Sequence, residues 1–224
     1  MTKSIILMSG GLDSVVSLAI AREKYNIELA LTFDYGQKSV KQEILSSDKI
    51  CKYYNVAHKV IKLDWLEKIT HTALVSNSDI PLNVDLENSK EAAKSVWVPN
   101  RNGLFLNIAA SFADAEDYDY IFIGANKEEA ATFSDNTQKF IDSINLEFEY
   151  STEKHPKVLA PLINFNKNDI VKQALEYSVP LELIWSCYSN ADVHCGKCES
   201  CMRLKRALKE NGGTKYLNLL FEKL

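Results

Sequence analysis

The sequence lacks three features that would define broad classes of protein. No apolar run approaches the length of a membrane-spanning helix. The N-terminus leads into a short apolar stretch, Ile5 to Met8, far short of the apolar region of a signal peptide. Positive charge is not in excess, since 26 Lys and Arg stand against 30 Asp and Glu. We therefore expect a cytoplasmic protein with no membrane partner and no surface devoted to nucleic acid.

The remaining composition is that of an ordinary globular protein and favours small-molecule substrates. Of the 224 residues, 46% are hydrophobic and 25% are charged, and the formal net charge is -4. A chain of this length buries a full core and leaves room for a small appendage. It shows no internal repeat and no low-complexity tract. We expect residues 1–180 to form the main domain and residues 181–224 an appended module.

Short apolar runs alternate with segments of helical periodicity through the first 180 residues. This alternation predicts a doubly wound α/β fold with a parallel sheet of about five strands. The expected strands are residues 5–8, 29–33, 60–63, 120–123 and 158–162. Expected helices run from a cap at Asp13 or Ser14 to residue 25, over residues 39–54, 104–112 and 137–148, and onward from a cap at Asn166. Residues 72–94 are polar and aperiodic, which predicts a long surface loop.

Residues 9–14, Ser-Gly-Gly-Leu-Asp-Ser, stand between the first expected strand and the first expected helix. A loop in this position presents free backbone N–H groups and the positive end of a helix dipole, which together bind phosphate. The two glycines let an anion approach closely, and the two serines supply hydroxyl donors. Asp13 is suited to hold Mg²⁺. Paired glycines alone are common in turns without function, but the whole string favours a phosphate site.

This glycine loop, residues 9–14, has no lysine after its last glycine, so it is not the common cradle of a γ-phosphate. It resembles the SGGxDS signature of the ATP-pyrophosphatase superfamily. Members of that superfamily have an adenine nucleotide alpha hydrolase-like fold and split ATP between its α and β phosphates. The resemblance implies that the chain uses ATP to adenylate a substrate oxygen.

Most of the cysteines are clustered near the C-terminus: Cys187, Cys195, Cys198 and Cys201. In a reducing compartment, four close thiolates are typical of tetrahedral zinc. Protein fills all four positions, so the metal is expected to be structural. A redox pair made from the last two cysteines and a ligand role for His194 are weaker alternatives. Cys51 stands apart on an expected helix and is expected to be a core residue.

The glycine loop and the cysteine cluster, in this order and spacing, resemble the 7-cyano-7-deazaguanine synthase family. Residues 32–37, residues 98–106 with their Pro-x-Arg-Asn core, and residues 162–167 carry the resemblance further. It implies an enzyme that adenylates 7-carboxy-7-deazaguanine with ATP and lets ammonia displace AMP to give an amide. A second ATP then converts the amide to the nitrile. Mg²⁺ and a homodimer are implied as well.

The resemblance also assigns roles to residues. The ATP site would comprise Met8, Ser9, Gly10, Gly11, Leu12, Asp13, Ser14, Leu31, Thr32 and Phe33. The catalytic residues would be Asp13, Arg101, Asp135 and Lys167, and the substrate contacts would be Tyr35, Gln37, Asn102 and Phe133. Arg101 and Lys167 would neutralise phosphate charge; the alternatives are a surface salt bridge and a solvated lysine at a helix start.

One segment departs from the family pattern. After its fourth strand the family carries an acidic residue and then Tyr-Ser-Gly-Tyr-Pro-Asp-Cys-Arg, near the deazaguanine site. Residues 129–137 here read Glu-Ala-Ala-Thr-Phe-Ser-Asp-Asn-Thr, so that only Phe133 and Asp135 keep the pattern. The divergence from Ala130 to Thr137 leaves the acyl acceptor open, while ATP use is unaffected.

Three alternatives therefore stand beside nitrile synthesis. A related ligase would stop at the amide, or would join the carboxylate to another amine such as a protein N-terminus in an antiviral defence system. tRNA thiolation uses a similar loop but usually needs a catalytic cysteine, and only Cys51 is free of the cluster. A nucleotide-binding or zinc-dependent module without catalysis is disfavoured by the retained Ser9, Asp13 and Ser14.

Overall fold

The computed structural model describes residues 2–76, 78–83 and 95–221. Within these residues a single sheet of five strands has the order β3-β2-β1-β4-β5, and every pair of neighbours is parallel. The strands are β1 (Lys3–Leu7), β2 (Asn26–Asp34), β3 (Ala57–Lys62), β4 (Tyr120–Phe122) and β5 (Lys157–Leu159). The predicted doubly wound α/β sheet of five strands is confirmed.

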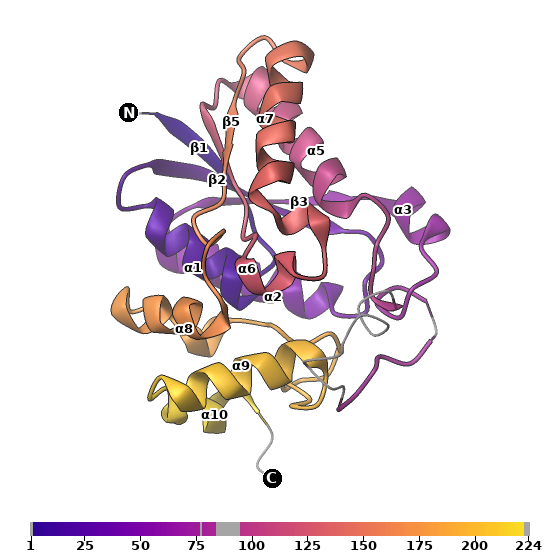
Figure 1. The fold of residues 1–224 in the computed structure, drawn as a ribbon, viewed down its shortest axis with the longest axis vertical. Coiled ribbons are helices and arrows are strands. Elements are labelled where there is room, and N and C mark those ends of the chain that lie inside the picture. Colours follow the sequence, from indigo (N-terminus) through magenta and orange to yellow (C-terminus); the bar gives the residue numbers. More distant parts are fainter. Residues whose placement is uncertain (1, 77, 84–94, 222–224) are drawn as a thin grey trace.

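Helices of very different length connect the strands and follow the last of them (Figure 1). The α-helices are α1 (Leu12–Ala21), α2 (Val40–Tyr54), α3 (Asp64–Ile69), α5 (Arg101–Glu116), α6 (Lys127–Ala130), α7 (Gln138–Ser151), α8 (Lys167–Glu176), α9 (Glu199–Glu210) and α10 (Thr214–Leu220). Two short 3₁₀ helices are η1 (Ser134–Asn136) and η2 (Leu181–Leu183).

Successive strand residues point to opposite faces of the sheet, and each face is covered by helices. Ile6 of β1 and Ala30 of β2 belong to an apolar cluster that includes residues of α1, α8 and α9. Ile5 and Leu31 belong to a second cluster with residues of α5 and α7. In Figure 1, α5 and α7 lie on the far side of the sheet from α1. Burial on both faces explains why the central strands read as continuous apolar runs.

The order of the strands reverses direction at β1. From β1 the chain builds outward through β2 to β3, and then it crosses back to add β4 and β5 on the other side. In an open α/β sheet, ligands bind in the crevice outside the carboxyl ends of the two strands that flank such a switch point. The glycine loop follows β1 and Gly124 follows β4, so both lie at this crevice.

Several boundaries differ from the sequence expectation. Helix α1 begins at Leu12 with Gly11 as its N-cap, so that Asp13 lies in the first turn and neither expected cap residue has that role. Asn166 does cap α8, and with Asp169 it forms a capping box. The short helices α3, α6 and α10 were not expected, because four to seven residues are too few to display helical periodicity.

The expected surface loop over residues 72–94 is only partly described, because residues 77 and 84–94 lie outside the described residues. In the parts described, residues 72–76 and 78–83, no helix or named strand is present, as expected. One isolated bridge joins Leu82 to Cys198. The described end of the loop therefore lies against the cysteine cluster.

The C-terminal segment packs on the same apolar cluster as α1. Leu204 and Leu208 of α9 and Leu220 of α10 are buried in that cluster beside Leu18 and Val171. In Figure 1 these last helices, orange to yellow, lie beneath α1 and α8. The division at residue 180 stays a prediction. Among the described residues no helix has the length and apolar character to cross a membrane.

Candidate functional site

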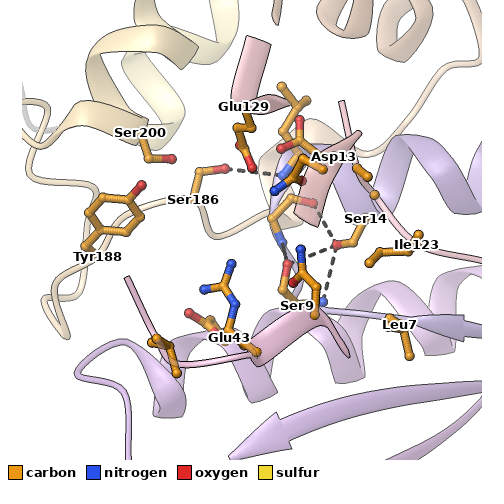
Figure 2. Close-up of a pocket in the computed structure, with 18 of the residues that line it drawn as sticks. Leu7, Ser9, Asp13, Ser14, Glu43, Ile123, Glu129, Ser186, Tyr188 and Ser200 are labelled. Carbon is orange, nitrogen blue, oxygen red and sulfur yellow. Dashed lines mark hydrogen bonds between the residues drawn. The ribbon is translucent and has the colours of Figure 1, made fainter. Parts of the chain in front are cut away.

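A cavity of about 280 Å³ lies at the switch point, between the ends of β1 and β4. Its walls come from parts of the chain that are far apart in sequence: the glycine loop, the end of β2, the segment that leads into α5 and the start of that helix, residues 123–136, Lys167, and the segment around residues 185–204. Figure 2 shows that the side chains of Ser9, Asp13, Glu129 and Ser186 gather at the start of α1. The cavity is therefore the site that the fold would use for a nucleotide.

The serines of the glycine loop fold the loop onto itself. The Ser14 hydroxyl donates to the Gly11 carbonyl over 3.1 Å and accepts from the Ser9 N–H over 3.3 Å. Because the Ser14 hydroxyl proton is already donated to Gly11, the Ser9 hydroxyl is the donor in the 3.2 Å contact between the two serine hydroxyls. The Ser9 hydroxyl also accepts from the Gly11 N–H. These contacts hold the backbone N–H groups of the loop in a compact turn ahead of α1.

Three glycines are required by close approach. Gly10 has φ of +72°, and a Cβ there would lie 2.7 Å from the Ser46 Oγ. A Cβ on Gly11 would lie 3.3 Å from the Ser9 Oγ and would project into the cradle that a phosphate would occupy. A Cβ on Gly124 would lie 3.0 Å from the backbone N of Ser14. The end of β4 therefore touches the start of α1, which closes the crevice at its base.

Asp13, Lys167 and Glu129 form a partly buried group of charges beside the loop. The Lys167 ammonium lies 2.5 Å from the Asp13 Oδ2 and 3.1 Å from the Glu129 Oε1. Burial raises the pKa of Asp13 to about 6, against the opposing effect of Lys167. Burial would also raise the pKa of Glu129, but Lys167 outweighs it and the pKa is lowered. Lys167 stays charged, since both carboxylates raise its pKa despite desolvation.

The second carboxylate oxygen of Asp13 fits a cation. Asp13 Oδ1 is buried and has no hydrogen-bond partner among the described residues, whereas Oδ2 also receives a 3.4 Å contact from Asn126. A buried carboxylate oxygen is costly to leave unpaired, and Mg²⁺ prefers such hard oxygen ligands together with substrate phosphates. Asp13 therefore suits the role of a magnesium ligand.

A second set of side chains surrounds Arg101 at the start of α5. Arg101 donates to the Tyr35 hydroxyl over 3.5 Å, and Asn102 donates to the Asp135 carbonyl over 3.2 Å. Burial raises the pKa of the Asp135 carboxyl, while the Arg101 charge opposes that rise. The Pro-x-Arg-Asn segment and η1 are thus held together at one wall of the cavity.

Aromatic rings line this same region. The Phe33 and Phe105 rings stack with centroids 3.9 Å apart, and Trp97 and Phe133 stack at 5.7 Å with an interplanar angle of 20°. All four residues line the cavity. Stacked apolar walls with one guanidinium and one carboxyl suit a flat, polar-edged ring.

The structure brings most of the predicted site residues together. Those that line the cavity are Met8, Ser9, Gly11, Leu12, Asp13, Ser14, Leu31, Thr32, Phe33, Tyr35, Arg101, Asn102, Phe133, Asp135 and Lys167. Two predicted residues lie behind its wall. Gly10 packs against Ser46. Gln37 is 2% exposed, and its side-chain amide is hydrogen-bonded to the Tyr35 N–H, the Phe33 carbonyl and the Glu43 carboxylate. The Gln37 side chain therefore shapes the turn after β2.

Sequence reasoning assigned no site role to other lining residues: Glu43, Trp97, Phe105, Glu129, Ser186, Tyr188, Glu199, Ser200 and Arg203. Phe105 and Glu129 lie in segments that were compared with the family, but no role followed for them from the comparison. For Glu129 a signal exists, since Asn126 caps α6 by accepting from the Glu129 N–H, and Asn followed three residues later by Glu is a helix-start pattern. The Glu128 side chain next to it is bound by Arg203 and, over 2.9 Å, by Arg206. Helix α6 is thereby tied to α9.

The four clustered cysteines meet as predicted. The sulfur atoms of Cys187, Cys195, Cys198 and Cys201 all lie within 4.8 Å of one another, which fits a single tetrahedral ion such as zinc. A ligand role for His194 and a catalytic role for Cys51 are not supported.

His194 is occupied elsewhere, because its Nε2 accepts from the Ser186 N–H and its Nδ1 faces the Leu220 carbonyl, each over 3.0 Å. Cys51 is 1% exposed, and burial raises its pKa to about 12, so it is a core residue and not a nucleophile.

The parallel sheet, the glycine loop at its switch point and the charged group beside the loop define an ATP-using enzyme of the α/β class. The family model described as "Queuosine biosynthesis protein QueC" matches residues 3–212. The chain therefore belongs to the QueC family of queuosine biosynthesis proteins.

Individual relatives agree with the family match. A 7-cyano-7-deazaguanine synthase of Methanosarcina mazei is 49% identical over 219 residues, which cover 94% of this chain and 95% of the relative. One of Carboxydothermus hydrogenoformans is 49% identical over 211 residues, 92% of this chain and 98% of the relative.

A solved 4-thiouridine synthetase in complex with RNA and bound ATP is more distant, with a TM-score of 0.51 and 17% identity. The match covers 96% of this chain and 52% of the synthetase chain, and it shows the fold alone.

Proposed function

We propose that the chain is an ATP-dependent ligase that converts 7-carboxy-7-deazaguanine and ammonia into 7-cyano-7-deazaguanine. The observation that carries the proposal is the joining, in one cavity, of a pyrophosphate-type loop with an aromatic, polar-edged pocket. Membership of the family over residues 3–212 supports this choice of substrate.

In the first step a carboxylate oxygen of the acid attacks the α-phosphorus of ATP. A new P–O bond forms, the bond between the α-phosphorus and the bridging oxygen breaks, and pyrophosphate leaves with the electron pair. Backbone N–H groups of the loop other than those of Ser9, Gly11 and Leu12, which are already hydrogen-bonded, would bind the leaving pyrophosphate as its charge develops. Mg²⁺, held by Asp13, would shield the phosphates. Lys167 and Arg101, which both line the cavity, would neutralise negative charge.

In the second step ammonia attacks the acyl carbon and AMP leaves, which gives the amide and releases a proton. The amide oxygen is then adenylated by a second ATP, again with loss of pyrophosphate. Loss of AMP and of the remaining N–H protons yields the nitrile. A carboxylate and an amide are both poor electrophiles, and adenylation converts each oxygen into a good leaving group.

The deazaguanine ring would lie against the Trp97 and Phe133 pair, with Tyr35, Asn102 and Asp135 at its polar edge. Residues 130–137 contribute to this wall through Phe133 and Asp135, which keep the family pattern, and through Asn136, which departs from it. The alternative of coupling to a protein amine rests on that divergence alone and is not favoured by the family match. The four cysteines would hold structural zinc. The homodimer stays a prediction from the resemblance, and the cytoplasmic location stays a prediction from the apolar pattern of the sequence.

Product mass tests the proposal. The protein, incubated with the acid, ATP, Mg²⁺ and an ammonium salt, is expected to give a product one water lighter than the amide, with pyrophosphate released. Accumulation of the amide alone would limit the enzyme to the first half of the reaction. Absence of turnover, in protein that binds ATP, would reject the proposal.

A further inference from the structure

We propose that Ser186, on the C-terminal segment, is a ligand of the pyrophosphate that the glycine loop binds, and that His194 is the residue that positions it. The inference depends on the proposed function in one respect, which is that pyrophosphate binds at the glycine loop. It assigns to the cysteine-bearing segment a direct part in nucleotide binding.

The first observation is a contact between Ser186 and the start of α1. The Leu12 N–H, one of the free amides at the helix N-terminus, donates to the Ser186 Oγ over 3.3 Å. Because Ser186 accepts this bond, its own hydroxyl proton remains to be donated. Among the described residues the Ser186 hydroxyl has no acceptor. In the loop, by contrast, the Ser14 proton is committed to the Gly11 carbonyl.

The second observation is the position of the Ser186 hydroxyl on the cavity wall. A Cβ built on Gly11 would lie 3.3 Å from the Ser9 Oγ and 3.9 Å from the Ser186 Oγ, so the two hydroxyls flank the same glycine. Ser186, Gly11 and Asp13 all line the cavity. In Figure 2 the Ser186 side chain extends from the C-terminal segment toward the loop. A phosphate above Gly11 would meet the Ser186 hydroxyl as a donor, whereas the Ser9 hydroxyl already donates to Ser14.

The third observation is that the segment before Ser186 is fastened to the loop by backbone contacts. The Trp185 N–H donates to the Gly10 carbonyl over 2.8 Å. The Ser46 hydroxyl of α2 contacts both the Gly10 carbonyl, at 3.0 Å, and the Leu183 carbonyl, at 2.6 Å. These bonds fix the position of Ser186 relative to the loop. They use the Trp185 N–H and the Gly10 and Leu183 carbonyls, none of which is proposed to contact pyrophosphate.

His194 fixes Ser186 from behind. The Ser186 N–H donates to His194 Nε2 over 3.0 Å, so Nε2 carries no proton and Nδ1–H donates to the Leu220 carbonyl over 3.0 Å. The ring is 2% exposed and packs on the Trp185 ring at 4.5 Å. One imidazole therefore links the last helix to the residue that faces the loop, and it has no free nitrogen for a metal.

The chemistry expected of Ser186 follows from these contacts. Phosphate oxygens accept hydrogen bonds strongly, and a hydroxyl that is already oriented loses little entropy when it donates. Ser186 would supply one neutral donor where Lys167 and Mg²⁺ supply charge. Its contribution is therefore expected in affinity for the pyrophosphate unit, and only weakly in the choice of acyl substrate.

Calorimetric titration with inorganic pyrophosphate and Mg²⁺ tests Ser186. Ser186→Ala is expected to weaken binding roughly tenfold, the loss of one hydrogen bond to a charged ligand, while Ser186→Thr keeps the hydroxyl and stays within about threefold of wild type. Ser143→Ala, on an exposed turn of α7, is the matched control, since its hydroxyl contacts only the Lys139 carbonyl. Wild-type affinity in Ser186→Ala would overturn the proposal.

Two substitutions of His194 test the positioning role. The Gln side chain brings an acceptor to the place of Nε2 and so keeps the Ser186 N–H bonded, whereas the Asn side chain reaches only the place of Nδ1. His194→Gln is expected to retain pyrophosphate affinity and His194→Asn to lose about fivefold, with the KM for ATP raised more than kcat is lowered. Equal affinities in the two variants would contradict the role. If the wild-type protein binds pyrophosphate but makes no nitrile, the proposed function fails while this inference stands.

Discussion

The cavity has two halves that are built in different ways. The nucleotide half consists of residues 9–14 with Lys167 and Ser186, and it is held by hydrogen bonds and ion pairs to backbone and charged groups. The aromatic half consists of Tyr35, Trp97, Arg101, Phe133 and Asp135, and it combines the stacked Trp97 and Phe133 rings with the hydrogen bond from Arg101 to Tyr35. The first half has fixed donors for one ligand shape. The second has apolar ring faces and a few polar groups.

The difference shows where substrate identity resides in this fold. A pyrophosphate needs donors at set positions, and the residues proposed to supply them lie in the glycine loop, at the start of α8 and at Ser186. A flat ring needs apolar faces and a few polar edges, and many side chains supply those. Among residues 130–137, Asn136 departs from the family pattern and lines the cavity beside the retained Phe133 and Asp135, and none of these residues belongs to the nucleotide half.

The largest effect is expected at Asp13, in the nucleotide half. Asp13→Asn removes the carboxylate proposed to hold Mg²⁺ and leaves Lys167 its ion pair with Glu129. Loss of that charge is expected to lower kcat for pyrophosphate release about 100-fold or more. The rate is measured with a coupled pyrophosphate assay, and circular dichroism checks the fold. Release at the wild-type rate would show that Asp13 is not part of the active site.

A smaller effect is expected when the metal cluster is broken. Cys201→Ser removes a fully buried thiolate from the four, and we expect loss of bound zinc, a fall in melting temperature of roughly 5–10 °C and weaker pyrophosphate binding through Ser186. Zinc content is measured by atomic emission and melting by calorimetry. Cys51→Ala is the control, because it removes a buried thiol yet is expected to keep the metal. Equal zinc content in the two variants would refute the assignment of the cluster.

Next in size are substitutions of the aromatic half. Trp97→Ala and Phe133→Ala are each expected to raise the KM for the acid about tenfold, since each removes one member of a stacked pair, while the KM for ATP stays within about twofold. Steady-state kinetics with one substrate varied at a time separates the two constants. A rise in the KM for ATP alone would reverse the comparison, because it would place adenine at these rings.

The smallest effect is expected in the pH dependence of the melting temperature, measured without Mg²⁺. Asp13 has a folded-state pKa of about 6 against an ordinary value of 3.8, so between these values the folded state binds more protons and stability falls as pH rises. Lys167 and Glu129 face the group and stay charged across most of this range. Relative to wild type, Asp13→Asn is expected to gain a few degrees in melting temperature between about pH 4 and pH 6.5. A difference that is independent of pH would contradict the raised pKa.

The sheet was predictable because buried parallel strands leave an unmistakable apolar run in sequence. The exception is the first half of β3, where Ala57, His58 and Lys59 sit on an edge strand and carry no continuous apolar signal. The order of the strands depends on packing between distant segments and has no local signature. The same is true of the contact between Gly124 and the start of α1.

The nucleotide half was predictable where one motif contains it and unpredictable where other segments complete it. Residues 9–14 form a recognisable motif. Lys167 is found through the family resemblance, because its place at a helix start also fits a solvated lysine. Ser186 is not, because its function depends on Leu12 and His194, which a single sequence does not relate to it. Gln37 is the opposite case: it was predicted to contact substrate, but its side chain is hydrogen-bonded to the backbone of the turn in which it lies.

The central claim is that the carboxylate of the deazaguanine acid is adenylated at this glycine loop. The most direct test uses 7-carboxy-7-deazaguanine labelled with ¹⁸O in both carboxylate oxygens, together with ATP, Mg²⁺ and ammonia. The account predicts that each AMP released carries one ¹⁸O, first from the acid and then from the amide, and that the nitrile carries none. Unlabelled AMP, or ADP with phosphate in place of AMP with pyrophosphate, would contradict it.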